Sequence, residues 1–222
     1  MAAQTLPRWV KPVAIVVGSG AVVAAIISST TIVSSDADGA GTSVAAGLQQ
    51  NEDFDPAATA AELFPQIVAD IPGAAIDIVD LHNGVQADEA AFGAEFGQDL
   101  GAGSFVVPVR IEGTVTEVDD AFIYFEVEGI DGENQAVVPI AGALNGGPVR
   151  DALGVIGFGD VPDQIAFQTL AQEIKNLMVA EVVEPVDPQS LVGKDVVVIG
   201  AWKNGLMTPQ YIVQPVIIEV PS

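Results

Sequence analysis

FVVPVRIEGTVTEVDDAFIYFEVEGIDGENQAVVPI, residues 105–140, decides the fold of this chain. Apolar residues recur at every second position along residues 105–115, and this period of two residues predicts a β-strand. The apolar stretches at residues 122–127 and 135–140, which are bounded by turn residues, predict a second and a third strand. Asp131-Gly132 lies between the second and third of them and is a strong hairpin signal. The stretch is therefore expected to form three consecutive strands joined by tight turns.

The residues that follow complete a five-stranded pattern. A glycine-rich loop at residues 141–147 leads into two helical stretches, residues 148–155 and 163–178. Two more strands are expected at residues 195–202 and 211–220. Three strands, a helical region and two strands is the order of an OB-type barrel. We therefore expect an α+β fold with a five-stranded OB-like β-barrel of the order βββ-α-ββ, and a plain open α+β sheet is the alternative.

Short helices are expected upstream of the barrel domain of residues 105–222, in a helical segment, residues 51–104, that packs on the barrel. Apolar residues recur there at helical spacing. Pro65 lies inside the first helical pattern, which predicts a kink or a break into two short helices. Further helical stretches are expected at residues 74–82 and 87–96.

The amino end is expected to be a membrane segment. Residues 13–33 hold no charged side chain, and at about 1.5 Å per residue they cover the roughly 30 Å hydrocarbon core of a bilayer. Arg8 and Lys11 precede this transmembrane anchor, so the positive-inside rule places residues 1–12 in the cytoplasm and exports the rest. A cleaved signal peptide is the alternative, and it exports the same domain. Residues 34–50 are small and polar, as in a flexible tether.

The composition excludes several classes of function. The chain has 222 residues, with 30 Asp and Glu against 7 Lys and Arg, and a net charge of −23. A surface this acidic repels phosphate backbones, so nucleic acid is not an expected partner. The absence of Cys from the chain excludes disulfides, thiol catalysis, thiolate metal sites and a lipid-modified cysteine. Because His82 is the single histidine, sites with several histidine ligands are excluded as well, and we expect no metal and no cofactor. His82 itself is expected at a helix end, where its charge is favourable.

No catalytic residue stands out. Carboxylate pairs are frequent because acids are frequent, and a general acid also needs an apolar pocket that raises its pKa. No Ser lies in a nucleophile elbow. OB barrels bind ligands on their second and third strands, and acids gather there in this chain. They are Asp119, Asp120, Glu126, Glu128, Asp131 and Glu133.

The candidate binding residues lie in residues 140–167. Arg150, one of the few basic residues outside the expected anchor, stands in the first turn of an expected helix after the glycine-rich loop. Free N–H groups and a cation suit an anionic or hydroxyl-rich ligand. The alternative is an ion pair of Arg150 with an acid that pins the loop to the barrel; the candidate acids are Asp151, Asp160 and Asp163. The candidate site residues are Asn145, Gly146, Arg150, Asp151 and Gln164, with Arg150 as the ligand contact.

The same stretch resembles a known family, the predicted periplasmic lipoproteins of domain-of-unknown-function family 2291. The matching segments are Gly146, Arg150-Asp151-Ala152, Phe158, Gln164-Ile165-Ala166-Phe167, Gln214-Pro215-Val216 and Ala90-Ala91-Phe92-Gly93. The resemblance covers residues 51–222. The lipobox cysteine that is usual in the family is missing here, which favours the helical anchor. Because members are usually encoded near ribose-type sugar ABC transporters, the resemblance implies an accessory role in sugar uptake, with no established activity.

These features predict a membrane-anchored extracytoplasmic accessory or binding protein that is not an enzyme. The expected partners are a sugar ABC transporter or its substrate-binding protein, and the membrane through the N-terminal helix. One alternative is a structural cell-envelope interaction protein, which would have no pocket and an exposed apolar patch. Another is a carboxylate-dependent hydrolase, which would hold two acids about 5–10 Å apart in a deep pocket.

Overall fold

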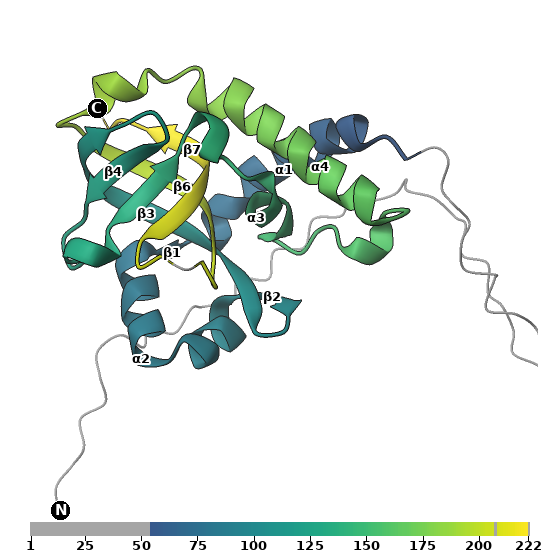
Figure 1. Cartoon of the computed structure of the whole chain (residues 1–222), viewed down its shortest axis with the longest axis horizontal. Helices are drawn as coiled ribbons and strands as arrows, with labels where there is room; N and C mark the ends of the chain where they lie inside the picture. The colour runs from purple at the N-terminus through teal and green to yellow at the C-terminus, as the bar shows by residue number, and fades with distance from the viewer. Residues whose placement is uncertain (1–53, 207, 222) are drawn as a thin grey trace, which may run out of the picture. The chain divides into compact units, whose positions relative to one another are not determined.

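A closed five-stranded barrel forms the centre of the computed structural model, which describes residues 54–206 and 208–221 (Figure 1). Its strands are β3 (Ser104–Val118), β4 (Phe122–Glu126), β5 (Ala136–Pro139), β6 (Asp195–Lys203) and β7 (Tyr211–Glu219). β3 pairs with β4, β4 with β5, β5 with β7 and β7 with β6, and only the β5–β7 pairing is parallel among these. β6 then pairs with β3 and closes the sheet on itself. The structure therefore confirms the OB-like barrel and excludes the open sheet.

The first helix, α1 (Pro56–Ala74), begins at Asp55, whose carboxylate accepts hydrogen bonds from two backbone N–H groups of the first turn at 2.9 and 3.1 Å. The helix runs unbroken through Pro65, so the expected break into two short helices is wrong. Pro65 is exposed, so water can reach the backbone carbonyl that loses its donor there. The opposite face of α1 buries Ile67 and Ile71.

The second helix, α2 (Ile78–Phe96), consists of two helical stretches that meet at Asp88, where the backbone angles are non-helical (φ −164°, ψ 97°). The helices expected at residues 74–82 and 87–96 therefore exist, but the first begins four residues later. It also runs on past His82. His82 lies inside the helix, and its expected place at a helix end is wrong because the helix continues through the Asn-Gly pair that follows.

Two short strands lie in residues 51–104, where only helices were expected. β1 (Ile76–Asp77) pairs in parallel with β3, and β2 (Gln98–Gly101) pairs with β3 in antiparallel fashion. Segments of this length cannot show an alternating pattern, so periodicity did not predict them. Both strands join the upstream segment to the first half of β3.

β3 is the strand on which the barrel closes. Residues 105–109 are buried without alternation, since α1 and α2 also pack against this strand. Further along, Ile111 and Val115 are fully buried. Gly113 lies where β4 crosses closely, because a Cβ there would be 2.6 Å from the carbonyl oxygen of Glu126. Glycine at this position therefore allows the strong bend of a small barrel.

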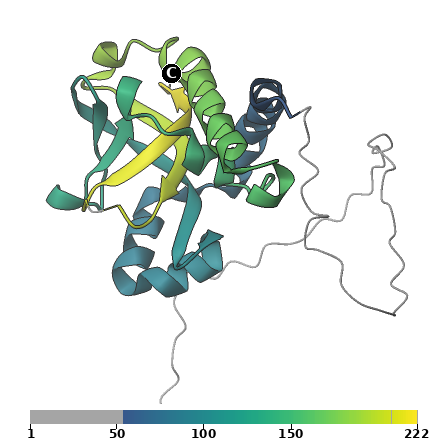
Figure 2. The same ribbon diagram turned by 45° about the vertical axis from the view of Figure 1, so that its right-hand side comes forward.

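The connection from β5 to β6 holds α3 (Gly146–Asp151) and α4 (Gln164–Leu177), which continues as a π-helical turn, Met178–Val183. The helix expected at residues 148–155 thus starts two residues earlier and is shorter, and the one expected at residues 163–178 matches α4 closely. Figures 1 and 2 show α4 running along one side of the barrel, with α1 beside it.

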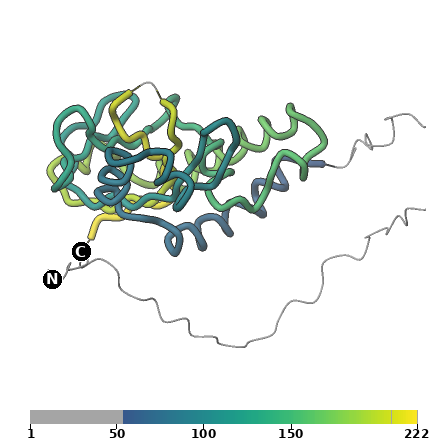
Figure 3. The backbone as a smooth tube through the Cα atoms, turned by 90° about the horizontal axis from the view of Figure 1, so that it is seen from below, coloured from purple at the N-terminus to yellow at the C-terminus, as the bar shows by residue number. Residues whose placement is uncertain are grey.

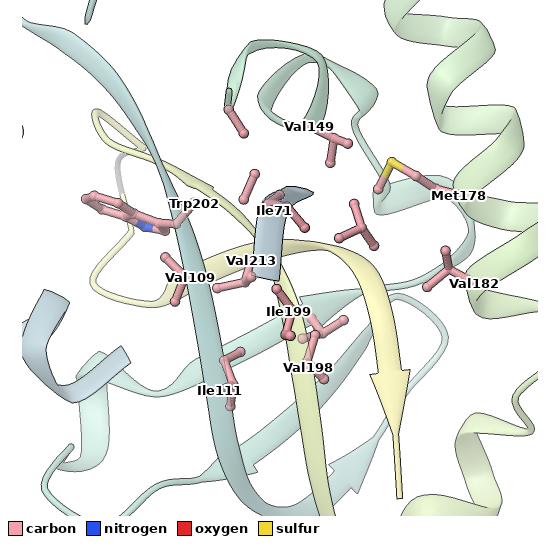
Figure 4. Packing of buried hydrophobic residues seen from close by; sticks show 14 of the residues in the cluster. Ile71, Val109, Ile111, Val149, Met178, Val182, Val198, Ile199, Trp202 and Val213 are labelled. Atoms are coloured by element: carbon pink, nitrogen blue, oxygen red, sulfur yellow. The ribbon is translucent and has the colours of Figure 1, made fainter. Parts of the chain in front are cut away.

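The hydrophobic core lies where these helices meet the barrel. Figure 4 shows Ile71 of α1, Val149 of α3 and Met178 at the end of α4 around the barrel. The facing strands contribute Val109 and Val213, and all five side chains are fully buried. Burial of Val149 holds α3 against the barrel, so the first turn of α3 faces α4.

Among the described residues, no helix is long and apolar enough to cross a bilayer. The expected cytoplasmic segment (residues 1–12), anchor (residues 13–33) and tether (residues 34–50) all lie outside the described residues.

Candidate functional site

A pocket of about 260 Å³ lies between the start of α3 and one face of α4. Three of the five expected site residues line it, namely Asn145, Gly146 and Arg150; Asp151 and Gln164 do not. The complete lining is Leu144, Asn145, Gly146, Arg150, Gln168, Ala171, Gln172 and Lys175. The structure therefore brings most of the predicted residues together and adds a second wall to them.

Asn145 caps the start of α3 and is hydrogen-bonded to the barrel. Its Oδ1 accepts a hydrogen bond from the N–H of Gly147 at 2.9 Å, which makes it the N-cap of the helix. Its own backbone N–H donates to Oε1 of Gln214, a buried residue of β7, at 2.8 Å. These two bonds leave the amino group of the exposed Asn145 side chain at the pocket, and they tie the start of α3 to the barrel wall.

The two helices touch at Gly146. A Cβ at this position would lie 2.0 Å from the carbonyl oxygen of Ala171 and 2.7 Å from the backbone nitrogen of Lys175. Any larger residue would therefore force α3 and α4 apart. Gly146 sets the distance between the two walls of the pocket.

Arg150 joins α3 to α4 and is only 7% exposed. Its Nε and Nη2 donate to the two carboxylate oxygens of Asp151 at 2.7 and 3.0 Å. Its Nη1 donates to the carbonyl oxygen of Phe167 at 2.7 Å, and its Cζ lies 3.2 Å from the centre of the Phe167 ring. Of the three acids considered as ion-pair partners, Asp151 is the one that pairs, whereas Asp160 and Asp163 each accept a bond from a nearby backbone N–H. Arg150 thus pins the loop and also forms part of the pocket wall.

The α4 wall of the pocket was not predicted from the sequence. It is formed by Gln168, Gln172 and Lys175, whose spacing of four and then three residues puts them on one face of the helix. The neighbouring face of α4 is apolar and buries Leu170 and Ile174 against the rest of the domain. One feature of the sequence could have indicated this wall: Lys175 is one of only five basic residues after residue 34, and so rare a charge is a candidate ligand contact.

Two of the expected site residues have other roles. Gln164 is the first residue of α4, is exposed and lies outside the pocket lining. Asp151 binds Arg150 through both carboxylate oxygens. Neither side chain belongs to the wall of the pocket.

The charge of the pocket differs from that of the whole chain. No Asp or Glu lines it, although the chain contains 30 of them. Among the described residues, the ion pairs join Arg110 to Glu112 and Arg150 to Asp151, so Lys175 has no carboxylate partner there. The pocket therefore presents one uncompensated positive charge surrounded by amide side chains.

The face on which OB barrels usually bind ligands is acidic, as expected, and the six acids named above are all exposed. Phe122 and Tyr124 of β4 lie beside them, with ring centres 6.2 Å apart. Asp119 accepts hydrogen bonds from the N–H groups of Ala121 and Phe122 at 2.7 Å each and from the Tyr124 hydroxyl at 2.8 Å. The bond from Ala121, followed by that from Tyr124, lowers the pKa of Asp119. Asp119 thus serves the β3–β4 turn.

Replacing Tyr124 with Phe removes the hydroxyl donor and keeps the ring. We expect the pKa of Asp119 to rise but to stay below its usual value, because both backbone donors remain. A depressed carboxyl pKa stabilises the folded state above the unfolded pKa, and this contribution is lost as the pH falls through the folded pKa. In Tyr124→Phe this contribution is therefore smaller, and its loss, which starts near the unfolded pKa in both proteins, is complete at a higher pH. NMR titration of the carboxyl carbons measures the shift, and an identical Asp119 curve in both proteins would contradict it.

The single histidine makes a structural contact. Nδ1 of His82 lies 2.9 Å from the hydroxyl of Tyr211, and the two rings meet edge to face. Burial raises the pKa of Tyr211. In the part of the chain that the structure describes, no group of three or more His, Asp or Glu side chains is placed to hold a metal ion. His82 therefore links α2 to the start of β7.

The molecule is similar to known proteins in fold and in sequence. It shares its fold with the crystal structure, at 1.90 Å resolution, of an OB-fold protein from Thermotoga maritima MSB8. The TM-score is 0.64, and the match covers 77% of this chain and 100% of that one at 20% identity, so it shows the fold alone. The sequence model of a predicted periplasmic lipoprotein family, DUF2291, matches residues 20–219. No curated protein matches the sequence.

Proposed function

Because the chain belongs to the predicted periplasmic lipoprotein family DUF2291, we propose that it is a non-enzymatic, extracytoplasmic binding protein that assists a sugar ABC transporter. The family description supports a membrane-associated, extracytoplasmic location and names no activity. The single observation that carries the binding role is the pocket between α3 and α4, lined by amides and cations in an acidic chain.

The size and chemistry of the pocket suit one sugar ring. Its volume of about 260 Å³ holds on the order of ten water molecules, about the space that a monosaccharide needs. Asn145, Gln168 and Gln172 carry amide groups, which both donate and accept hydrogen bonds. Sugar hydroxyls do the same. The Asn145 oxygen already accepts a bond from Gly147 and Nε2 of Gln172 donates one to Asn176 at 3.2 Å, so their other amide groups and the whole amide of Gln168 are the groups that can pair with hydroxyls.

The membrane attachment that we propose is the uncharged segment of residues 13–33. The chain has no Cys, so a lipid linked through cysteine has no attachment site in it. With this attachment the binding domain would lie on the outer side, where a transporter or its substrate-binding protein is the proposed partner. The support for that partner is the family resemblance together with the sugar-sized pocket.

A panel of monosaccharides and their uronic acids, added to the full-length chain in detergent, tests the binding role by thermal unfolding. A ligand at 100 times its Kd should raise the melting temperature by about 5–10 °C. Gln168→Ala removes one amide from the pocket and should weaken binding by about five- to tenfold, as expected for one neutral hydrogen bond.

Gln66→Ala is the matched control, because Gln66 is also an exposed glutamine on a helix but lies on α1, outside the pocket lining. It should leave ligand affinity unchanged. The proposal fails if no compound of the panel shifts the unfolding transition, or if both alanine variants weaken binding equally.

The structural cell-envelope alternative, a second candidate, meets one of its two expectations: apolar side chains are exposed, whereas the expected lack of a pocket is not met. Val155, Phe158 and Ile165 are 52, 58 and 74% exposed, and they follow one another in the loop before α4 and in its first turn. Figure 3 shows this loop and the start of α1 at the same end of the domain. Exposed apolar side chains that lie close together in the chain suit a protein contact. The hydrolase alternative has no comparable support, because no Asp or Glu lines the pocket.

Co-purification from solubilised membranes, with mass spectrometry of the bound proteins, distinguishes the two candidates. An accessory binding protein should retain a transporter component and a sugar-sized ligand. A purely structural protein should retain an envelope partner while the compounds of the panel leave its unfolding unchanged.

A further inference from the structure

The pocket contains basic side chains but no acidic ones. Five of the seven Lys and Arg residues follow residue 34, and two of these five, Arg150 and Lys175, line the pocket. None of the eight lining residues is acidic, in a chain with 30 acids among 222 residues. The pocket is therefore a local exception in a protein with a net charge of −23.

The two cations differ in what they offer a ligand. Asp151 neutralises the charge of Arg150 through two hydrogen bonds of 2.7 and 3.0 Å, and Phe167 covers one face of the guanidinium. Lys175 is half-buried and pairs with no carboxylate among the described residues. The positive charge of Lys175 is thus the one that a ligand can balance.

Amides surround this charge on both walls. Gln168 and Gln172 lie on the same face of α4, two turns and one turn before Lys175. Nε2 of Gln172 donates one hydrogen bond to Asn176 at 3.2 Å, which leaves its oxygen and its second N–H for a ligand. Asn145, the N-cap of α3, lies on the other wall, with its Oδ1 engaged as the helix cap and its amino group left for a ligand. Figure 1 shows α3 beside α4, the two elements that carry these groups. One cation with three amides is complementary to one negative group attached to several hydroxyls.

We propose that the ligand of this pocket is a small monoanionic polyol, a sugar acid of one ring, and that Lys175 selects it over the neutral sugar. The inference rests on the proposed binding function and names its ligand class. Lys175 holds the carboxylate by a charge-assisted hydrogen bond, and the amides hold the hydroxyls. A phosphate ester, with nearly two negative charges, is a poorer fit, because a single cation leaves one charge unbalanced beside an acidic surface.

The test measures binding of galacturonate, galactose and galactose 6-phosphate to the full-length chain by titration calorimetry. Wild type should bind galacturonate about 10- to 100-fold more tightly than galactose, as expected for one hydrogen bond to a charged group. Lys175→Gln should remove this preference while still binding galactose, and Lys175→Arg should restore most of it. Lys194→Gln is the control, because Lys194 is exposed and outside the pocket lining.

The outcomes separate the ligand class from the proposed function. Equal affinity of wild type for galacturonate and galactose, or a preference that survives Lys175→Gln, overturns the inference and leaves the binding function standing. Tighter binding of the phosphate ester than of galacturonate overturns it as well. Binding of none of the three sugars, or of any sugar in the wider panel, overturns both proposals. Melting curves without ligand check that each variant is folded.

Discussion

Gly146→Ala is expected to lower the free energy of unfolding by about 3 kcal/mol and the melting temperature by about 6–12 °C. The added methyl group would lie 2.0 Å from the carbonyl oxygen of Ala171 and 2.7 Å from the backbone nitrogen of Lys175. Both neighbours are backbone atoms of α4, so no side-chain rotation relieves the contact, and the two helices must separate. Because they form the two walls of the pocket, ligand affinity should fall as well.

Gly142→Ala is the control for this variant. Gly142 lies in the same connection before α3, but a Cβ there meets no atom within 4 Å. Its effect should stay within about 0.5 kcal/mol, as for most surface substitutions. Chemical unfolding and thermal melting measure both variants. Equal stability of the two would mean that α3 does not pack against α4 as closely as the structure shows.

Arg150→Met is the second substitution with a large expected effect, a loss of about 3 kcal/mol in the free energy of unfolding. Methionine keeps most of the length of the side chain but removes every donor. Asp151, with a side chain only 14% exposed, would then hold an unpaired charge, and the carbonyl of Phe167 would lose its donor. Most of the loss in unfolding free energy therefore comes from burying the unpaired Asp151 carboxylate, and less from losing its attraction to Arg150.

A double substitution checks that reason. In Arg150→Met combined with Asp151→Asn the stranded charge is absent, so stability should recover by about 1–2 kcal/mol relative to Arg150→Met alone. Arg110→Met is the control for an exposed pair, since Arg110 and Glu112 have side chains 41% and 58% exposed. It should cost less than about 1 kcal/mol. A similar loss for Arg110→Met and Arg150→Met would contradict the buried role of Arg150.

The two interpretations of Arg150 are distinguished by the same variant. If Arg150 acts mainly as a pin, Arg150→Met loses stability, and saturating sugar acid still binds to the molecules that remain folded. If Arg150 is the main ligand contact, binding falls further than stability does. The bonds to Asp151 and Phe167 lead us to expect the first result.

Local patterns predicted the helices and strands that are long enough to show a periodic spacing of apolar residues. The strand at residues 105–115 and the helix at residues 163–178 show periods of two and of about 3.6 residues, and both are present in the structure. β1 and β2 are too short for any period to appear. Asn145 and Gly146 were predicted as site residues from a glycine-rich loop and a nearby cation, whereas Gln168 and Gln172 looked like ordinary exposed residues of an amphipathic helix.

By itself the sequence determined the order and kind of the main elements, the acidity of the molecule and one side of the pocket, the one formed by Asn145, Gly146 and Arg150. These depend on side-chain alternation, turn residues and composition, which act over a few neighbouring positions. Only the tertiary structure decided which face of α4 meets α3, that Asp151 rather than a ligand takes the charge of Arg150, and that Lys175 remains uncompensated beside three amides. Such facts follow from contacts between segments about 25 residues apart, at a spacing that a glycine with no side chain permits.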